Sequence, residues 1–217
     1  GATDLHLGDG MLIYSLILFN RGKTCVCIGS GGGFIPRLMT QARRDLWSQG
    51  IFEGNNQAEW GDIGTTIIID AANGVGGFTD WTEENSFLRQ HFAPQVIIET
   101  SERAYYDYFV RQDIKIDYLH IDGDHSYEGV KKDFELYSQI MSENGIITIH
   151  DTDQSYHNTF LIPDTQKTDF AEFDGPAKFI EELKNNSKYN LVNLKNFITF
   201  THKTTSTGLT VVTKNKI

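Results

Sequence analysis

Acidic and histidine side chains cluster at two points of this chain. In the first cluster an apolar run ends at Asp122 and continues as Gly-Asp-His-Ser-Tyr, and in the second a later apolar run ends in His150-Asp151. The carboxyl ends of parallel strands lie at the same edge of a sheet, so Asp122 and Asp151 are expected to converge there. Two convergent carboxylates favour a hard divalent cation, with magnesium as the expected ion.

The same residues also admit purely structural roles. Asp122 and Asp124 could cap a helix that starts near Ser126, a role worth about 1 kcal/mol. His125 could be a loop residue hydrogen-bonded to the backbone, and His120 could pack on its strand or support a ligand from behind. These readings stay open on the sequence alone.

A glycine-rich loop, Gly29-Ser30-Gly31-Gly32-Gly33, follows the short apolar run Thr24–Ile28. Such a loop lets the backbone approach a ligand closely and turn sharply into a helix. No Lys-Ser or Lys-Thr follows it, which excludes a phosphate loop, and Phe34 stands where a dinucleotide fingerprint needs a small residue. A nucleoside-type ligand is therefore expected, with a purely structural turn as the alternative.

Asp70 follows the apolar run Thr65–Ile69 and could accept hydrogen bonds from both hydroxyls of a ribose. Its separation from Gly29 exceeds the roughly 20 residues that are usual for this role. The polar segment Gly50–Gly64 reads as an inserted loop that accounts for the excess. Capping of a following turn is the alternative role for Asp70.

Short apolar runs that alternate with helical patterns must position these residues. The expected strands are Thr24–Ile28, Thr65–Ile69, Gln95–Glu99, Ile116–Ile121 and Gly145–Ile149. The expected helices are Met11–Phe19, Phe34–Ser48, Asp80–Phe92, Ser101–Gln112, Ser126–Met141 and Gly175–Asn186. Two final strand-like runs, Tyr189–Thr201 and Gly208–Thr213, flank an expected turn at Lys203–Thr207.

This alternation predicts an α/β fold, a doubly wound, Rossmann-like, mostly parallel seven-stranded sheet. The closing hairpin predicts a C-terminal antiparallel strand at one edge. Ligands of such sheets bind outside the carboxyl ends of the strands, so the functional residues are expected at that rim. The segments 50–64, 71–81 and 152–174 are placed to cover the rim, and Trp60, Trp81 and Phe160 could stack on an acceptor there.

Composition narrows the class of protein. The 217 residues fit a single domain, 1–217, and the net charge of −10 argues against partners such as nucleic acid or an anionic membrane. Cys25 and Cys27 are expected to be free, buried thiols in a reducing compartment rather than metal ligands. The longest apolar stretch, Met11–Phe19, is too short to span a bilayer, so the expected location is cytoplasmic.

The motifs from Thr24 to Asp151 resemble those of class I methyltransferases that depend on S-adenosylmethionine (SAM). The chain is most similar to the branch of macrolide sugar O-methyltransferases and cephalosporin-hydroxylase-like proteins. The resemblance implies that SAM contacts a set of loop and strand-end residues, namely Gly29, Ser30, Gly31, Gly33, Asp70 and Ser101. It also implies metal ligands at Asp122, Asp151 and His150 and a general base at His125. At His150 related metal-dependent enzymes often have an acid, and a histidine suits a softer metal than magnesium.

The expected reaction is therefore metal-assisted O-methylation of a small molecule or sugar. A bound cation stabilises an alkoxide and a nearby imidazole takes the proton, whereas an amine acceptor would need no such metal. One alternative is a non-haem iron enzyme with His120, Asp122 and His150 as its three ligands. Another is an inactive SAM-binding module, and a homo-oligomer is left open.

Overall fold

The computed structural model describes residues 8–31, 33–48, 64–71, 83, 85–153, 174–195, 197–200 and 203–215. The helical elements are α1 (Asp9–Asn20), α2 (Phe34–Ser48), α3 (Phe87–Phe92), α4 (Ser101–Ala104), the π-helix η2 (Tyr105–Val110), α5 (Tyr127–Tyr137), the 3₁₀-helix η3 (Ser138–Ile140) and α7 (Gly175–Leu183). The strands are β1 (Thr24–Ile28), β2 (Thr65–Ile69), β3 (Gln95–Ile97), β4 (Ile116–Ile121), β5 (Met141–His150), β6 (Tyr189–Leu194), β7 (Phe197–Phe200), β8 (Lys203–Ser206) and β9 (Leu209–Lys214).

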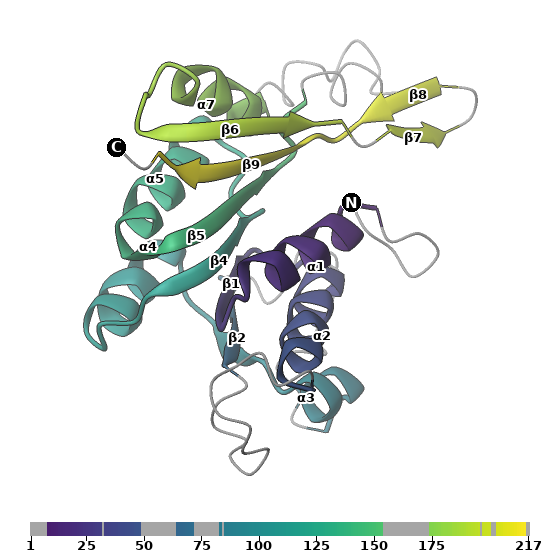
Figure 1. Cartoon of the computed structure of the whole chain (residues 1–217), viewed down its shortest axis with the longest axis vertical. Coiled ribbons are helices and arrows are strands. Elements are labelled where there is room, and N and C mark those ends of the chain that lie inside the picture. Colours follow the sequence, from purple (N-terminus) through teal and green to yellow (C-terminus); the bar gives the residue numbers. More distant parts are fainter. Residues whose placement is uncertain are drawn as a thin grey trace.

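Seven strands form one sheet in the order β3-β2-β1-β4-β5-β9-β6, which confirms the predicted fold class (Figure 1). The strands from β3 to β5 are parallel, and β9 is antiparallel to both β5 and β6. The predicted C-terminal antiparallel strand is confirmed as β9, which lies between β5 and β6 and hydrogen-bonds to both, so the strand at the edge of the sheet is β6.

Helices cover both faces of the sheet, α1 and α2 on one side and α4, α5 and α7 on the other (Figure 1). Side chains of a strand alternate between faces, and β1 follows this rule. Cys25 and Cys27 pack with the α1 and α2 side chains, whereas Val26 and Ile28 pack with the opposite layer. Both cysteines are free and buried, as predicted, and burial raises the pKa of Cys25 to about 12.

The strand register aligns the ends of β2, β1, β4 and β5. Ile28 pairs with Ile69 of β2 and with Ile121 of β4, and Ile121 pairs in turn with Ile149 of β5. The next residue of each strand is therefore at the same level of the rim. Those four residues are Asp70, Gly29, Asp122 and His150.

Several predicted boundaries are corrected by the structure. Helix α3 begins at Phe87 rather than Asp80, because the Ser86 side chain caps it by accepting a hydrogen bond from the Arg89 N–H. The helix predicted to run to Met141 gives way to η3 at Ser138, and β5 begins at Met141.

The C-terminal region also differs from the prediction. The run 189–201 contains two strands, β6 and β7, and the expected turn contains β8, which pairs with β7 in a separate hairpin. Two consecutive threonines in β8 have the β-branched side chains that favour a strand. Most of the rim-covering segments 50–64, 71–81 and 152–174, with Trp60, Trp81 and Phe160, lies outside the described residues.

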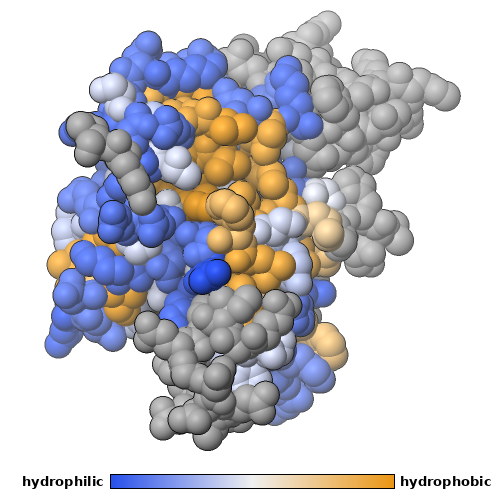
Figure 2. All heavy atoms as spheres, viewed as in Figure 1, coloured by the Kyte–Doolittle hydropathy of each residue, from blue (hydrophilic) through white to orange (hydrophobic). Residues whose placement is uncertain are grey.

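Apolar side chains gather on one face of the molecule, over β5, β9 and the neighbouring end of α1 (Figure 2). Two large apolar side chains, Met11 of α1 and Val192 of β6, are 49% and 56% exposed. Among the helices that the structure describes, none is both long enough and apolar enough to cross a membrane.

Candidate functional site

The glycine loop after β1 has a different environment at each of two glycines. Gly29 has φ +79°, and a Cβ there would lie 2.1 Å from the carbonyl oxygen of Asp122. Gly31 has φ +44°, and a Cβ there would meet no described atom within 4 Å. At Gly29 the loop is thus packed tightly against the end of β4. Two residues later, at Gly31, no described atom crowds the backbone, as close approach of a ligand requires. Gly32 lies outside the described residues.

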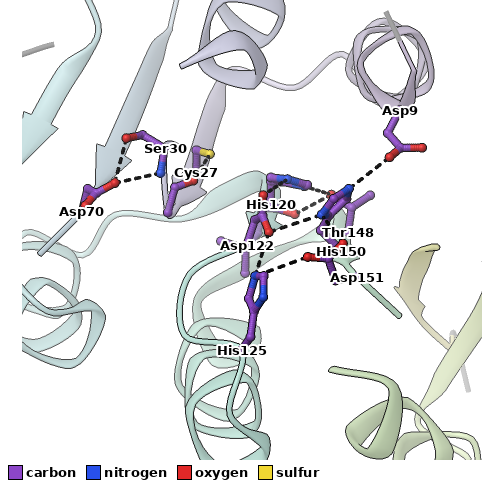
Figure 3. Close-up of polar contacts among 12 residues, drawn as sticks. Asp9, Cys27, Ser30, Asp70, His120, Asp122, His125, Thr148, His150 and Asp151 are labelled. Carbon is purple, nitrogen blue, oxygen red and sulfur yellow. Dashed lines mark hydrogen bonds and ion pairs between the residues drawn. The ribbon is translucent and has the colours of Figure 1, made fainter. Parts of the chain in front are cut away.

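Asp70 anchors this loop from the end of β2 (Figure 3). Its Oδ2 accepts hydrogen bonds from the backbone N–H of Ser30 at 2.9 Å and from the Ser30 hydroxyl at 2.7 Å. The N–H of Gly33 closes the turn by donating to the Ser30 carbonyl at 2.7 Å. The structure therefore brings together five residues predicted to bind a cofactor, namely Gly29, Ser30, Gly31, Gly33 and Asp70.

Three predicted site residues meet at the ends of β4 and β5. His125 Nε2 lies 3.2 Å from Asp122 Oδ1 and 3.5 Å from Asp151 Oδ2 (Figure 3). One potential ligand atom from each residue lies within 4.8 Å of the other two, so the three could hold a metal ion. Asp151 has the left-handed φ of +55°, an uncommon conformation that often marks functional sites.

The helix cap does not use Asp122. Ser126 is the N-cap of α5, since its hydroxyl accepts from the Gly129 N–H at 3.0 Å. Asp124 supports this turn by accepting from the Ser126 N–H at 2.9 Å. The structural role considered for the acidic stretch thus belongs to Ser126 and Asp124, and the Asp122 carboxylate faces the histidines.

His150 lies against the same carboxylates and is also held by a residue that the sequence analysis missed. Its Nδ1 lies 3.3 Å from Asp122 Oδ1 and 3.1 Å from Asp151 Oδ1, and its Nε2 lies 3.1 Å from Asp9 Oδ2. Asp9 is the first residue of α1 and is 6% exposed. An acid at the start of an apolar helix was the only sequence signal, and it suggests dipole stabilisation rather than a site.

The charges of this cluster shift its ionisation. Burial alone would raise the pKa of Asp122, but the charge of His150 and the hydrogen bond from His125 bring it well below its usual range. The hydrogen bond with Asp122 raises the pKa of His125 despite its partial burial. Burial alone would lower the pKa of His150, yet the neighbouring carboxylates, Asp122 first, raise it well above its usual value. The Asp122 carboxylate is thus ionised and faces two imidazoles, those of His125 and His150, whose pKa values are raised.

His120 lies beside this cluster on the α1 face of β4. Burial lowers its pKa to about 4, so the ring is neutral near pH 7. Its Nδ1 is 3.0 Å from the Thr148 hydroxyl, which is also 2.9 Å from the Tyr118 hydroxyl. Its Nε2 is 4.0 Å from Asp122 Oδ2 and is buried with no hydrogen-bond partner among the described residues.

Ser101, predicted to contact a cofactor, begins α4 and has a structural contact. Its hydroxyl donates to Asp133 of α5, and its carbonyl accepts from the Tyr137 hydroxyl at 2.8 Å. Burial raises the pKa of Asp133 to about 6. Ser101 thus joins α4 to α5.

Comparisons with known proteins agree with this arrangement. The family model of a methyltransferase domain matches residues 26–152, which include the glycine loop and both aspartates of the cluster. No curated protein matches the chain.

Solved methyltransferases have a similar fold. The O-methyltransferase TomG from Streptomyces achromogenes, solved with SAM, has a TM-score of 0.65 and 13% identity, over 96% of this chain and 80% of that chain. An O-methyltransferase from Bacillus cereus, solved with S-adenosylhomocysteine (SAH), has a TM-score of 0.64 and 14% identity, over 95% and 80%. A SAH-bound methyltransferase from Podospora anserina has a TM-score of 0.59 and 13% identity, over 96% and 78%.

Proposed function

The chain belongs to the methyltransferase domain family, and from this membership we propose that it transfers a methyl group from SAM to a hydroxyl of a small molecule or sugar. We further propose that a divalent cation bound at Asp122 and Asp151 assists the transfer. Two of the structurally similar proteins are O-methyltransferases solved with SAM or SAH. The free, buried cysteines suit a reducing, cytoplasmic setting for this reaction.

The donor is proposed to bind at the glycine loop. The open space in front of Gly31 allows the backbone to approach the methionine and ribose portions of SAM. The Asp70 carboxylate accepts from Ser30, and a carboxylate has about four acceptor sites, which leaves capacity for ribose hydroxyls. Asp70 would then align the donor and the loop together.

The residues of the cluster fit a divalent cation. The Asp122 carboxylate is ionised, since its pKa is well below the usual range, and two buried imidazole nitrogens face it with no hydrogen-bond partner among the described residues. When bound, the cation would stabilise the negative charge of an ionising hydroxyl, whose ionisation at pH 7 otherwise costs roughly 12 kcal/mol if its pKa is near that of water. An amine nucleophile has no such cost, so the aspartate pair favours oxygen as the acceptor atom.

His125 is proposed to accept the proton. It is the most exposed histidine of the cluster, and its Nε2 lies between the two carboxylates. In the reaction the acceptor O–H bond breaks as its proton passes to His125 Nδ1, because Nε2 already donates to Asp122, and the oxygen forms a bond to the methyl carbon. The carbon–sulfur bond breaks in line, its electron pair returns to sulfur, and SAH leaves as a neutral thioether.

One observation supports this proposal above the rest, namely the contact between the glycine loop and the strand end that supplies Asp122. The non-haem iron alternative gives the glycine loop and Asp70 no role, and the family match favours methyl transfer. The inactive SAM-binding module becomes an outcome of the test.

The test combines SAM calorimetry with methyl transfer to hydroxylated and amine acceptors, with and without a chelator. We expect SAM binding, transfer to a hydroxyl, and loss of turnover on chelation. His125→Gln is expected to lower turnover by about 100-fold or more while SAM binding stays within about threefold. SAM binding without transfer to any acceptor would indicate the inactive module, and full turnover under chelator would remove the metal.

A further inference from the structure

His150 uses its two ring nitrogens in different ways. Nε2 lies 3.1 Å from the Asp9 carboxylate, a hydrogen bond that joins β5 to α1. Nδ1 lies within 3.3 Å of one oxygen of Asp122 and one of Asp151, yet it makes no well-aligned hydrogen bond to either or to any other described residue. The side chain is 10% exposed, so water does not readily replace the missing partner.

This arrangement matches the way that proteins orient a histidine that binds a metal. Such a histidine usually donates its second ring N–H to a carboxylate, which fixes the tautomer and leaves the other nitrogen with a lone pair for the metal. Asp9 is placed to accept that hydrogen bond, and Nδ1 then faces the oxygens of the proposed cation site. Asp9 thus acts as a positioning residue, through His150.

A second unpartnered nitrogen faces the same carboxylate. His120 Nε2 is buried, and it lies 4.0 Å from Asp122 Oδ2 on the side opposite its bond to Thr148. Asp122 is therefore surrounded by His120, His125 and His150 rather than by oxygen ligands alone. Magnesium prefers carboxylate and water oxygens, whereas imidazole nitrogens suit iron, nickel and zinc, and cobalt lies between iron and nickel in the same order of affinity.

We infer that His150 Nδ1 is a cation ligand oriented by Asp9, and that it makes the site select a borderline transition cation such as Zn²⁺ or Co²⁺ over Mg²⁺. This inference rests on the cation site of the proposed function. It assigns Asp9 a role in that site and replaces magnesium as the expected ion.

A counter-charge role for His150 predicts the opposite response to substitution. If His150 only neutralises Asp122 and Asp151, its removal leaves two uncompensated carboxylates and strengthens the binding of every cation. If Nδ1 is a ligand, removal weakens Zn²⁺ and Co²⁺ binding and spares Mg²⁺. The direction of the change therefore separates the two roles.

The experiment titrates the metal-free chain of residues 1–217 with Zn²⁺, Co²⁺ and Mg²⁺ by calorimetry, without SAM or acceptor, and records the visible spectrum of bound Co²⁺. The variants are His150→Asn, His150→Asp, Asp9→Asn and, as a control on an exposed histidine of α3, His91→Asn. His150→Asn should weaken Zn²⁺ and Co²⁺ binding by about 10-fold or more, and Asp9→Asn should do so less strongly. His150→Asp should shift the preference toward Mg²⁺, and both His150 variants should change the Co²⁺ spectrum.

His91→Asn should leave all affinities and the spectrum unchanged. An unchanged ratio of Zn²⁺ to Mg²⁺ affinity in both His150 variants, or tighter binding of all three cations, would overturn the inference. Circular dichroism confirms that each variant is folded, and SAM calorimetry on the same samples tests the donor site separately. SAM binding with failed cation selectivity therefore rejects this inference and leaves methyl transfer standing.

Discussion

The two ends of the rim differ in the chemical groups that form them. At the β1–β2 end, a backbone loop is held by hydrogen bonds from the uncharged donors of Ser30 to a single carboxylate, that of Asp70. At the β4–β5 end, carboxylates and imidazoles from α1, β4, β5 and the loop before α5 lie close together. The first end offers shape and hydrogen-bond acceptors, and the second offers charge and titratable groups.

This difference separates two tasks that methyl transfer needs. A sulfonium donor carries its own leaving group and requires alignment more than activation. A hydroxyl acceptor requires removal of a proton and stabilisation of the resulting charge. Substitutions should therefore affect one end without the other, except at the point where the two ends touch.

The largest effect is expected at that point of contact. Gly29→Ala places a methyl group against the Asp122 carbonyl at a left-handed φ, so both ends should be disturbed. We expect a loss of about 3 kcal/mol or more in unfolding free energy, with loss of both SAM and cation binding. Chemical denaturation and calorimetry measure these. Gly31→Ala is the matched control, and it should cost about 1 kcal/mol and weaken SAM alone. Equal effects of the two variants would contradict the contact.

Asp122→Ala should affect only the β4–β5 end of the rim. Turnover is expected to fall by about 100-fold or more because the cation site and the partner of His125 are both lost, while SAM affinity changes less than about threefold. Steady-state kinetics and SAM calorimetry check this. The neighbouring Asp124→Ala removes only the support of the helix cap and should cost about 1 kcal/mol of stability with turnover retained. Equal turnover losses in both variants would show that folding, not the cation site, is responsible.

Asp70→Asn should affect only the β1–β2 end of the rim. SAM affinity is expected to fall by about 10-fold, because hydrogen bonds to a charged acceptor are replaced by weaker ones. Cation affinity, measured by the same calorimetric titration used above, should not change. A change in cation affinity without a change in SAM affinity would reverse the assignment of the two ends.

The last effect concerns stability rather than binding, at the link between α4 and α5. The pKa of Asp133, raised to about 6 by burial, means that ionisation is disfavoured in the folded state, so the native protein loses stability as pH rises from about 4 to about 6. Asp133→Asn should lack this loss and be more stable above pH 6 by on the order of 2 kcal/mol. Urea denaturation at pH 4 and pH 8 tests this. Identical pH dependence in both proteins would remove Asp133 from the account.

The arrangement of residues at the β1–β2 end could be predicted from the sequence almost completely, and that at the β4–β5 end only in part. Strand, glycine loop and terminal acid are consecutive local patterns, and the parallel register then determines their positions. The β4–β5 end includes Asp9, which α1 brings to His150 through tertiary packing that no local pattern records. The position of β9 between β5 and β6 could not be predicted for the same reason, since a hairpin in sequence does not reveal which gap in the sheet its second strand will occupy.

The contact of Gly29 with the Asp122 carbonyl has a consequence for how this enzyme could diversify. The separation between the glycine loop and Asp122 is determined by hydrogen-bonded neighbouring strands, because the Asp122 N–H also donates to the Ile28 carbonyl at 2.9 Å. Segments that select the acceptor can then change length or composition while the reacting atoms keep their spacing. Grafting a foreign acceptor loop onto this scaffold should alter which alcohol is methylated before it alters how fast the methyl group moves.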